Sequence, residues 1–123
     1  MLILHYSDGR NVVQLHEGHH YIMPTISKLL TLRLWKGDDF IKEVVWDKPI
    51  LKIGKLASAD IRIEDKLTSR MHALLEVRGQ DVVLIDLGSV SGTFVNGQKR
   101  TQIQLKSGDS ILVGETRIEV TFQ

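Results

Sequence analysis

Short runs in which hydrophobic and polar residues alternate dominate the sequence, and turn residues separate these runs about every 8–12 positions. The last run, Thr116–Phe122, shows the pattern most clearly, because Ile118, Val120 and Phe122 alternate with polar residues. Successive side chains of a strand point to opposite faces, so this run predicts a strand with one buried face. Helical periodicity is nearly absent. The pattern therefore predicts an all-β fold, either a sandwich or a barrel.

About ten short strands are expected after residue 30. Turn residues between neighbouring runs predict hairpins at Lys36–Asp39 and Arg78–Asp81, and Asn96-Gly97 is the strongest short hairpin signal in the chain. Ser107-Gly108-Asp109 predicts a further turn between two strands. The runs expected to form strands are Thr31–Trp35, Phe40–Trp46, Ile50–Ile53, Ile61–Ile63, Ala73–Val77, Val82–Ile85, Thr93–Val95, Ile103–Leu105, Ser110–Val113 and Thr116–Phe122.

Residues 1–30 form a separate segment in this pattern. Leu2–Tyr6 and Val12–His16 flank the turn sequence Ser7–Arg10, which predicts an extra N-terminal β-hairpin followed by a connector. Because a lone hairpin is only marginally stable in water, we expect it to dock on the main domain, to pair with another chain, or to be the remnant of something longer. Pairing between chains would make the protein a homo-oligomer. The expected division is an N-terminal extension at 1–30 and a main domain at 31–123.

The composition is that of an ordinary globular domain, with 42% hydrophobic and 25% charged residues among 123. The chain has no cysteine, which excludes a disulfide framework, a thiolate nucleophile and a cysteine-ligated metal. No apolar run approaches the roughly 20 residues that span a bilayer, so we expect no membrane insertion and a cytoplasmic location. A net charge of +1 argues against a dedicated nucleic-acid-binding protein.

The sequence contains no motif that indicates catalysis. It has neither a Gly-x-Ser-x-Gly nucleophile elbow nor a phosphate loop of the Gly-x-x-x-x-Gly-Lys-Ser/Thr type, so we expect no enzymatic activity and no cofactor. His16-Glu17-Gly18-His19-His20 gathers candidate metal ligands, but its spacing matches no helical His-x-x-x-His pair. We interpret this cluster as a solvated loop and expect no metal site.

Three polar, glycine-containing loops between Leu51 and Gly97 carry the residues best suited to binding. Lys55 offers an ammonium group, Ser69-Arg70 a hydroxyl and a guanidinium, and Gly88–Thr93 further hydroxyls and approachable backbone amides. Such donors suit a phosphate dianion, and the loops supply no obvious group for attacking it. Loops at one end of a β-sandwich are held rigidly by the sheets. The loops therefore indicate recognition of a phosphate and not its hydrolysis.

The order and spacing of these motifs resemble a forkhead-associated (FHA) domain over about residues 31–123. The resemblance implies an eleven-stranded β-sandwich that binds phosphothreonine peptides through loops at one end, with a Ser/Thr kinase acting upstream. It rests on Ile53-Gly54-Lys55, Ser69-Arg70-Met71-His72, Asp86–Gly97, Leu105–Asp109 and Ile111–Gly114.

The resemblance assigns roles to individual residues. Lys55 stands where the family usually has arginine, and it keeps the charge but lacks the bidentate fork. Ser91 stands where asparagine is usual, and it has one side-chain donor instead of two. The residues assigned to phosphopeptide contact are Lys55, Ser69, Arg70, Val90 and Ser91, with Val90 a source of apolar contact for the threonine methyl group. Those assigned to the structure of the loops are Gly54, His72, Ser89, Gly92 and Asn96.

The resemblance favours a signalling module that recruits partners phosphorylated by a Ser/Thr kinase. The departures at Lys55 and Ser91 leave an alternative open, in which a degenerate FHA scaffold mediates phosphate-independent docking in a larger bacterial assembly, including a membrane-associated one. A third interpretation is that Thr25, Ser27 or Thr31 becomes phosphorylated and docks in the domain's own loops or in those of a neighbour. Dependence of binding on phosphate and on salt distinguishes the first two.

Overall fold

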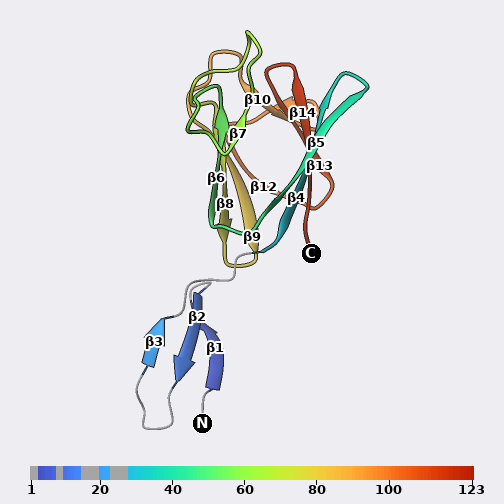
Figure 1. The fold of residues 1–123 in the computed structure, drawn as a ribbon. Coiled ribbons are helices and arrows are strands. Elements are labelled where there is room, and N and C mark those ends of the chain that lie inside the picture. Colours follow the sequence, from blue (N-terminus) through green and yellow to red (C-terminus); the bar gives the residue numbers. More distant parts are fainter. Residues whose placement is uncertain (1–2, 8–9, 15–19, 23–27) are drawn as a thin grey trace.

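The computed structural model describes residues 3–7, 10–14, 20–22 and 28–123, and within them it contains fourteen strands and no helix. Eleven of the strands form two sheets that face each other as a β-sandwich (Figure 1). The expected all-β sandwich is thus confirmed. None of the described residues forms a helix able to cross a membrane.

The six-stranded sheet has the order β11-β10-β13-β14-β4-β5, and every neighbouring pair in it is antiparallel. The five-stranded sheet has the order β12-β9-β8-β6-β7, and its pair β6-β7 is parallel. The strands of the first sheet are β4 (Leu30–Lys36), β5 (Asp39–Trp46), β10 (Thr93–Val95), β11 (Gln98–Lys99), β13 (Asp109–Val113) and β14 (Thr116–Thr121). Those of the second are β6 (Ile50–Gly54), β7 (Ile61–Arg62), β8 (Ala73–Arg78), β9 (Asp81–Asp86) and β12 (Gln102–Leu105).

The hydrophobic core lies between the two sheets and follows the alternation seen in the sequence. In β4, Leu30, Leu32 and Leu34 are at most 2% exposed, whereas Arg33 between them is exposed. Burying one apolar face of each sheet removes these side chains from water, which is the main favourable contribution to folding. The other buried residues of the core are Leu51, Ile53, Ile61, Ile63, Ala73, Leu75, Val82, Leu84, Val95, Leu105, Ile111, Val113, Ile118 and Val120.

The three hairpins predicted after residue 30 are all present. β4 pairs with β5 across Gly37, and β8 pairs with β9 across Gly79, and both glycines have positive φ. Asn96 and Gly97 connect β10 to β11 with φ values of 49° and 85°. Two consecutive residues in the left-handed region are what a tight two-residue hairpin turn requires, and asparagine followed by glycine adopts it most readily.

Two features of the strand order were not predicted. β11 adds a strand to the ten that the alternation pattern predicts, and so completes the eleven that the resemblance implies. It consists of Gln98 and Lys99, which are both exposed and carry no hydrophobic signal. The turn at Ser107–Asp109 joins strands of different sheets, because β12 pairs with β9 whereas β13 pairs with β10 and β14. This turn therefore passes the chain from one sheet to the other.

The N-terminal strands form a sheet of their own. β1 (Ile3–Ser7) and β2 (Arg10–Gln14) make the expected hairpin, and β3 (His20–Ile22) pairs with β2 as a third strand that the sequence pattern had not indicated. Residues 15–19 and 23–27 lie outside the described residues. They include most of the histidine cluster and two of the three candidate phosphorylation sites. The domain division at residue 30 stays a prediction.

Candidate functional site

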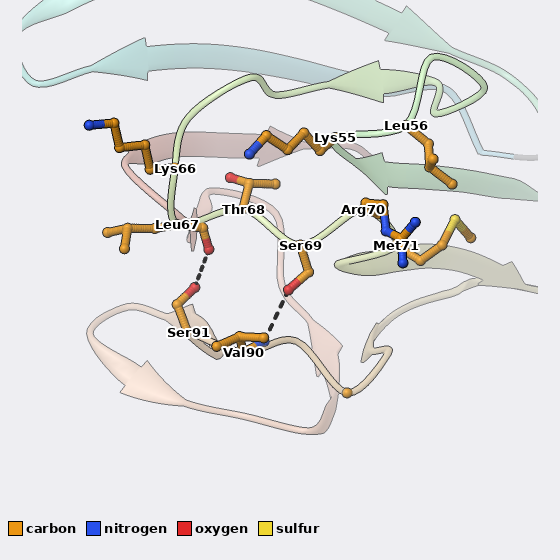
Figure 2. Close-up of a pocket in the computed structure, with 11 residues that line it drawn as sticks. Lys55, Leu56, Lys66, Leu67, Thr68, Ser69, Arg70, Met71, Val90 and Ser91 are labelled. Atoms are coloured by element: carbon orange, nitrogen blue, oxygen red, sulfur yellow. Dashed lines mark hydrogen bonds between the residues drawn. The ribbon is translucent and has the colours of Figure 1, made fainter.

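A pocket of about 640 Å³ opens at one end of the sandwich, where three loops meet. The first loop (residues 55–60) follows β6, the second (63–72) connects β7 to β8, and the third (87–92) connects β9 to β10. They contain the polar motifs singled out in the sequence, and Figure 2 shows their side chains around the pocket. The lining residues are Lys55, Leu56, Lys66, Leu67, Thr68, Ser69, Arg70, Met71, Gly88, Val90 and Ser91.

The pocket lining carries positive charge only. Lys55, Lys66 and Arg70 contribute cations, and none of the lining residues is acidic. Within the described part of the chain, none of these three side chains forms an ion pair. A concave surface with one sign of charge attracts a ligand of the opposite sign. Lys66 was not among the expected site residues, because a single lysine outside a motif gives no signal.

Two hydrogen bonds tie the third loop to the second along one side of the pocket (Figure 2). The backbone N–H of Val90 donates to Ser69 Oγ over 3.0 Å, and Ser91 Oγ donates to the Leu67 carbonyl over 2.6 Å. Because Ser69 Oγ accepts the bond from Val90, its own O–H can still donate to a ligand. Ser91 instead uses its single side-chain donor within the protein.

His72 lies behind the pocket, fully buried, and joins the same two loops. Its Nδ1 accepts a hydrogen bond from the Ser69 backbone N–H at 3.0 Å, and its Nε2 lies 2.9 Å from the Gly92 carbonyl oxygen. Since Nδ1 accepts a proton donor, the ring hydrogen must sit on Nε2, from which it donates to Gly92. The imidazole thus bonds to both loops and contacts Ser69 through its backbone N–H. The loop-structuring role assigned to His72 stays a prediction.

Asp86 organises the third loop from its beginning. Its carboxylate accepts hydrogen bonds from the Gly88 N–H, the Ser89 N–H and hydroxyl, and the Thr93 hydroxyl. Burial raises the pKa of the Asp86 carboxyl, but the hydrogen bonds from Ser89, Thr93 and Gly88 together outweigh this effect and lower it below the ordinary value. The sequence carried the signal for this role, because aspartate followed two or three residues later by glycine and serine is typical of a side-chain-capped turn.

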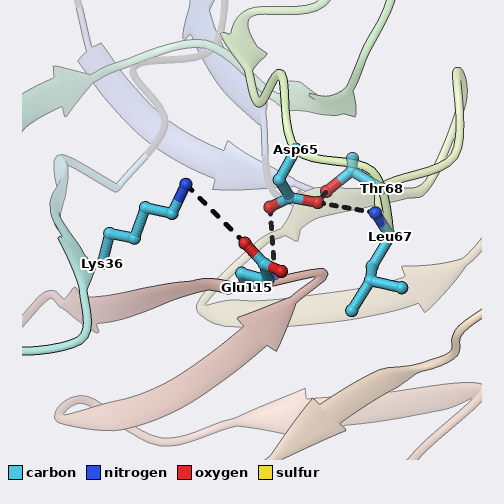
Figure 3. A network of polar contacts seen from close by, with 5 residues as sticks. All are labelled: Lys36, Asp65, Leu67, Thr68 and Glu115. Atoms are coloured by element: carbon cyan, nitrogen blue, oxygen red, sulfur yellow. Dashed lines mark hydrogen bonds and ion pairs between the residues drawn. The ribbon is translucent and has the colours of Figure 1, made fainter.

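Asp65 organises the second loop, as Asp86 organises the third, by accepting hydrogen bonds with its carboxylate (Figure 3). Its carboxylate accepts the Leu67 N–H at 3.0 Å, the Thr68 hydroxyl at 2.7 Å and the Glu115 N–H at 2.9 Å. Burial raises the pKa of Asp65, and these hydrogen bonds outweigh it and lower the pKa below its ordinary value. Lys36 adds an ion pair to Glu115 at 3.6 Å. The network fastens the second loop to the β13–β14 turn.

Gly54, the last residue of β6, permits a close approach of two backbones. A Cβ atom at this position would collide with the carbonyl oxygen of Arg70. The next residue, Lys55, donates its backbone N–H to the carbonyls of Ser69 and Arg70 at 3.1 and 3.0 Å. Because Gly54 has no side chain, the backbone of the second loop can lie directly against the end of β6. Ser69 and Arg70 are therefore held next to Lys55.

Exposed apolar side chains form part of the pocket rim. Val90 is 94% exposed, and Leu67 and Met71 are 51% and 42% exposed. Single exposed hydrophobic residues are common, but these three surround one cationic pocket. The pocket can thus accept a group that combines a dianion with an apolar substituent.

The structure brings all five expected contact residues to this one pocket. Of the residues assigned to loop structure, Asn96 lies apart, in the β10–β11 turn, where its amide donates to Asp109 over 3.0 Å. Sequence reasoning missed Lys66, Leu67 and the carboxylate of Asp65. No group of three or more histidine, aspartate or glutamate side chains in the described residues is arranged to hold a metal ion.

Comparison with a family model and with related proteins points to one family. The model of the family described as FHA domain matches residues 51–114, just over half of the chain. Over 96 residues the chain is 30% identical to the oxoglutarate dehydrogenase inhibitor of Corynebacterium efficiens and 29% identical to the glycogen accumulation regulator GarA of Mycolicibacterium smegmatis. The match covers 78% of this chain but only 66% and 60% of the two relatives, so the chain spans less than two thirds of their length.

Solved structures resemble the sandwich as a whole. A structure from a study of phosphothreonine-dependent FHA domain interactions superposes with a TM-score of 0.70 and 32% identity, over 77% of this chain and 97% of that one. The FHA domain of FhaA, solved in complex with an intracellular domain of another protein, gives a TM-score of 0.67 and 33% identity, over 74% of this chain and 98% of that one.

Proposed function

This chain belongs to the forkhead-associated (FHA) domain family, and on that premise we propose that it binds proteins containing phosphothreonine. The observation that carries the proposal is the pocket in which Lys55, Ser69 and Arg70 converge without an acidic neighbour. It supplies an ammonium, a guanidinium and a hydroxyl to a ligand that carries about −1.5 to −2 charge and three acceptor oxygens.

Each of the three side chains has a distinct task in this proposal. Arg70 and Lys55 neutralise the phosphate charge, and charge-assisted hydrogen bonds of this kind are about twice as strong as neutral ones. The Ser69 hydroxyl donates to a phosphate oxygen, because its own oxygen is oriented by the Val90 N–H. Lys66 extends the positive potential at the pocket edge and favours additional acidic residues in the ligand.

Val90 supports a preference for phosphothreonine over phosphoserine. Its side chain is 94% exposed and belongs to the residue whose N–H bonds Ser69, so an apolar surface stands beside the proposed phosphate position. Covering the threonine methyl group with this side chain removes apolar area from water, and one methyl group contributes roughly 0.8 kcal/mol. Phosphoserine lacks that group.

The relatives support a regulatory and non-catalytic role. They are named as an inhibitor of oxoglutarate dehydrogenase and as a regulator of glycogen accumulation, and the pocket lining contains no histidine, aspartate or glutamate that could activate a nucleophile. We propose that a Ser/Thr kinase phosphorylates the partner, that recognition takes place in the cytoplasm, and that neither nucleic acid nor membrane insertion is involved. The chain then acts as an adaptor for the phosphorylated protein.

Fluorescence anisotropy with an oriented library of phosphothreonine peptides tests the proposal. Matched unphosphorylated and phosphoserine peptides serve as controls, each at low and at physiological salt. We expect selective binding with a Kd of about 1–100 μM that weakens as salt rises. An Arg70→Ala variant should lose most of this binding and keep its melting temperature, because the side chain is exposed. A variant that binds like the original protein would show that the site is wrongly assigned.

One observation favours a second candidate function. The Ser91 hydroxyl already donates to the Leu67 carbonyl, so the position where the family usually has asparagine offers no further side-chain donor to a peptide backbone. A scaffold that docks unmodified proteins does not need that donor. The anisotropy titrations with phosphorylated and unphosphorylated peptides distinguish the two candidate functions, because a scaffold binds its partners equally with and without phosphate.

A further inference from the structure

A row of large side chains crosses the outer face of the six-stranded sheet. Its members are direct cross-strand partners, so they share one face, and the buried residues between them show that this face points away from the core. Phe40 is 46% exposed and Leu112 is 39% exposed. This aromatic row consists of Lys99, Phe94, Leu112, Arg117, Trp35 and Phe40.

Arg117 is the centre of the aromatic row. Its guanidinium stacks over the Trp35 ring at 5.2 Å, and the Trp35 ring meets Phe40 edge to face at 5.1 Å. Among the described residues, no carboxylate lies within ion-pair distance of Arg117. The row thus holds two cations, Arg117 and Lys99, and no acid. Tryptophan, phenylalanine and arginine are among the side chains enriched at protein interfaces, and tryptophan and arginine are also enriched among the residues that contribute most binding energy.

A second row of opposite charge runs beside the first. It lies two residues further along β13, β14 and β4, on the same face, at a spacing of roughly 7 Å. Its two carboxylates and one guanidinium leave it with one net negative charge, which resides on Glu119 because Arg33 pairs with Glu43 at 3.6 Å. The Arg33 guanidinium also lies 5.5 Å from the centroid of the Phe40 ring in the aromatic row. This acidic row consists of Ser110, Glu119, Arg33 and Glu43.

We propose that a second copy of this chain docks on this face, with a twofold axis that lies in the interface, parallel to the two rows and midway between them. Rotation about that axis places each aromatic row on the acidic row of the other copy. Arg117 then faces Glu119 of the second copy, and Trp35 faces its Arg33, and both contacts occur twice. A closed dimer requires a surface that complements itself, and the opposite charges of the two rows meet this condition.

The arrangement leaves both pockets accessible. The third loop leads directly into β10, so the pocket lies at the end of the sheet nearest the aromatic row. The twofold axis reverses the strand direction between copies, which puts the two pockets at opposite ends of the dimer. Such a dimer engages two binding sites at once and gains affinity through effective concentration. The dimer does not depend on what the pocket binds.

Sedimentation velocity of the full chain from about 1 μM to about 1 mM tests the dimer. We expect a dimer whose dissociation constant rises about tenfold or more in Arg117→Glu, and likewise in Glu119→Arg, because each change sets like charges against each other twice. Lys106→Glu, on the turn between β12 and β13, is the control with the same charge change and should leave the dimer intact.

Mixing the two variants gives the decisive result. In a 1:1 mixture, the carboxylates at positions 117 and 119 of the Arg117→Glu variant face the guanidinium groups at positions 119 and 117 of the Glu119→Arg variant. A heterodimer should therefore form over the same concentration range as the wild-type dimer. Arg117→Gln and Glu119→Gln, which weaken the dimer about threefold each, replace the reversals if those fail to fold. A protein that is monomeric throughout, a dimer insensitive to Arg117→Glu, or a mixture that stays monomeric would each overturn the proposal.

Discussion

The hydroxyl of Ser91 donates a hydrogen bond to the backbone carbonyl of Leu67 over 2.6 Å. This contact joins the third loop to the second, next to the bond between the Val90 N–H and Ser69 Oγ. The two bonds tie these loops to each other beside the pocket, and Figure 2 shows both of them. Ser91, whose position was expected to contact the bound peptide, therefore forms a hydrogen bond between two loops of the pocket instead.

Replacing Ser91 with asparagine should strengthen phosphopeptide binding. Asparagine supplies two donors and an acceptor, so one group can reach a peptide backbone that the serine hydroxyl does not serve. We expect Ser91→Asn to lower the Kd about threefold to tenfold, equivalent to one ordinary hydrogen bond. Ser58→Asn, in the first loop outside the pocket lining, is the matched control. Unchanged affinity in Ser91→Asn, measured by anisotropy, would show that no peptide backbone passes this position.

The charge at Lys55 gives a second gain-of-function prediction. Arginine presents a planar fork that bonds two phosphate oxygens, whereas the lysine ammonium acts as a point charge. We expect Lys55→Arg to tighten phosphopeptide binding about threefold to tenfold, and Lys55→Ala to weaken it about tenfold and to reduce its salt dependence. Lys106→Arg and Lys106→Ala make the same two substitutions outside the pocket lining and serve as controls. An equal effect of salt on Lys55→Ala and on the original protein would remove Lys55 from the binding site.

The strands and the three loops were accessible to sequence reasoning because their signals are local. Alternation of apolar residues placed β4, β8 and β14, and the left-handed turn at Asn96-Gly97 follows from the two residue types alone. Ser69 and Arg70 were placed together because they are adjacent and belong to a motif with fixed spacing. β11, with two exposed polar residues, has no such signal.

The contacts that shape the pocket were not accessible, because they join residues distant in sequence. The Asp65 carboxylate accepts the N–H of Glu115, fifty positions away, and His72 bonds Gly92 across twenty. No spacing rule links such pairs, and only the sheet registers bring them together. The involvement of Ser91 with Leu67 has the same origin. Sequence therefore indicated five of the residues that line the site, and the structure determines which of their donors are already in use.

His72 should be essential for stability. Removing the imidazole leaves the Ser69 N–H and the Gly92 carbonyl without their partner in the interior, and it also leaves a cavity. Each of these changes destabilises the folded state, so we expect His72→Ala to lower the free energy of unfolding by about 3–5 kcal/mol in urea titrations. Met71→Ala, at the neighbouring position that is 42% exposed, should cost less than about 1 kcal/mol. Similar losses in both variants would mean that the imidazole bonds do not stabilise the loops.

Asp86 and Asp65 should make the stability of the protein depend on acid pH. The pKa of each carboxyl is lowered in the folded state, because hydrogen bonds to the charged form outweigh burial, which raises it. A depressed folded pKa contributes stability that is fully present above the unfolded value of about 3.9 and is lost as the pH falls through the folded value. The free energy of unfolding should therefore decline below about pH 4.

Asp86→Asn isolates this contribution. At pH 7 the variant should be less stable by about 1–3 kcal/mol, because an amide offers one acceptor oxygen where the carboxylate offers two to the Gly88, Ser89 and Thr93 donors. The difference from the original protein should shrink as the pH falls below about 4, since the carboxyl is protonated first in the unfolded state and its contribution is lost as the pH falls through the folded value. Urea unfolding of both proteins at pH 3, 5 and 7 measures this difference in the free energy of unfolding. Asp38→Asn, in the β4–β5 turn, is the control for the loss of one charge. A difference that stays constant across this range would contradict the carboxylate's role in holding the third loop.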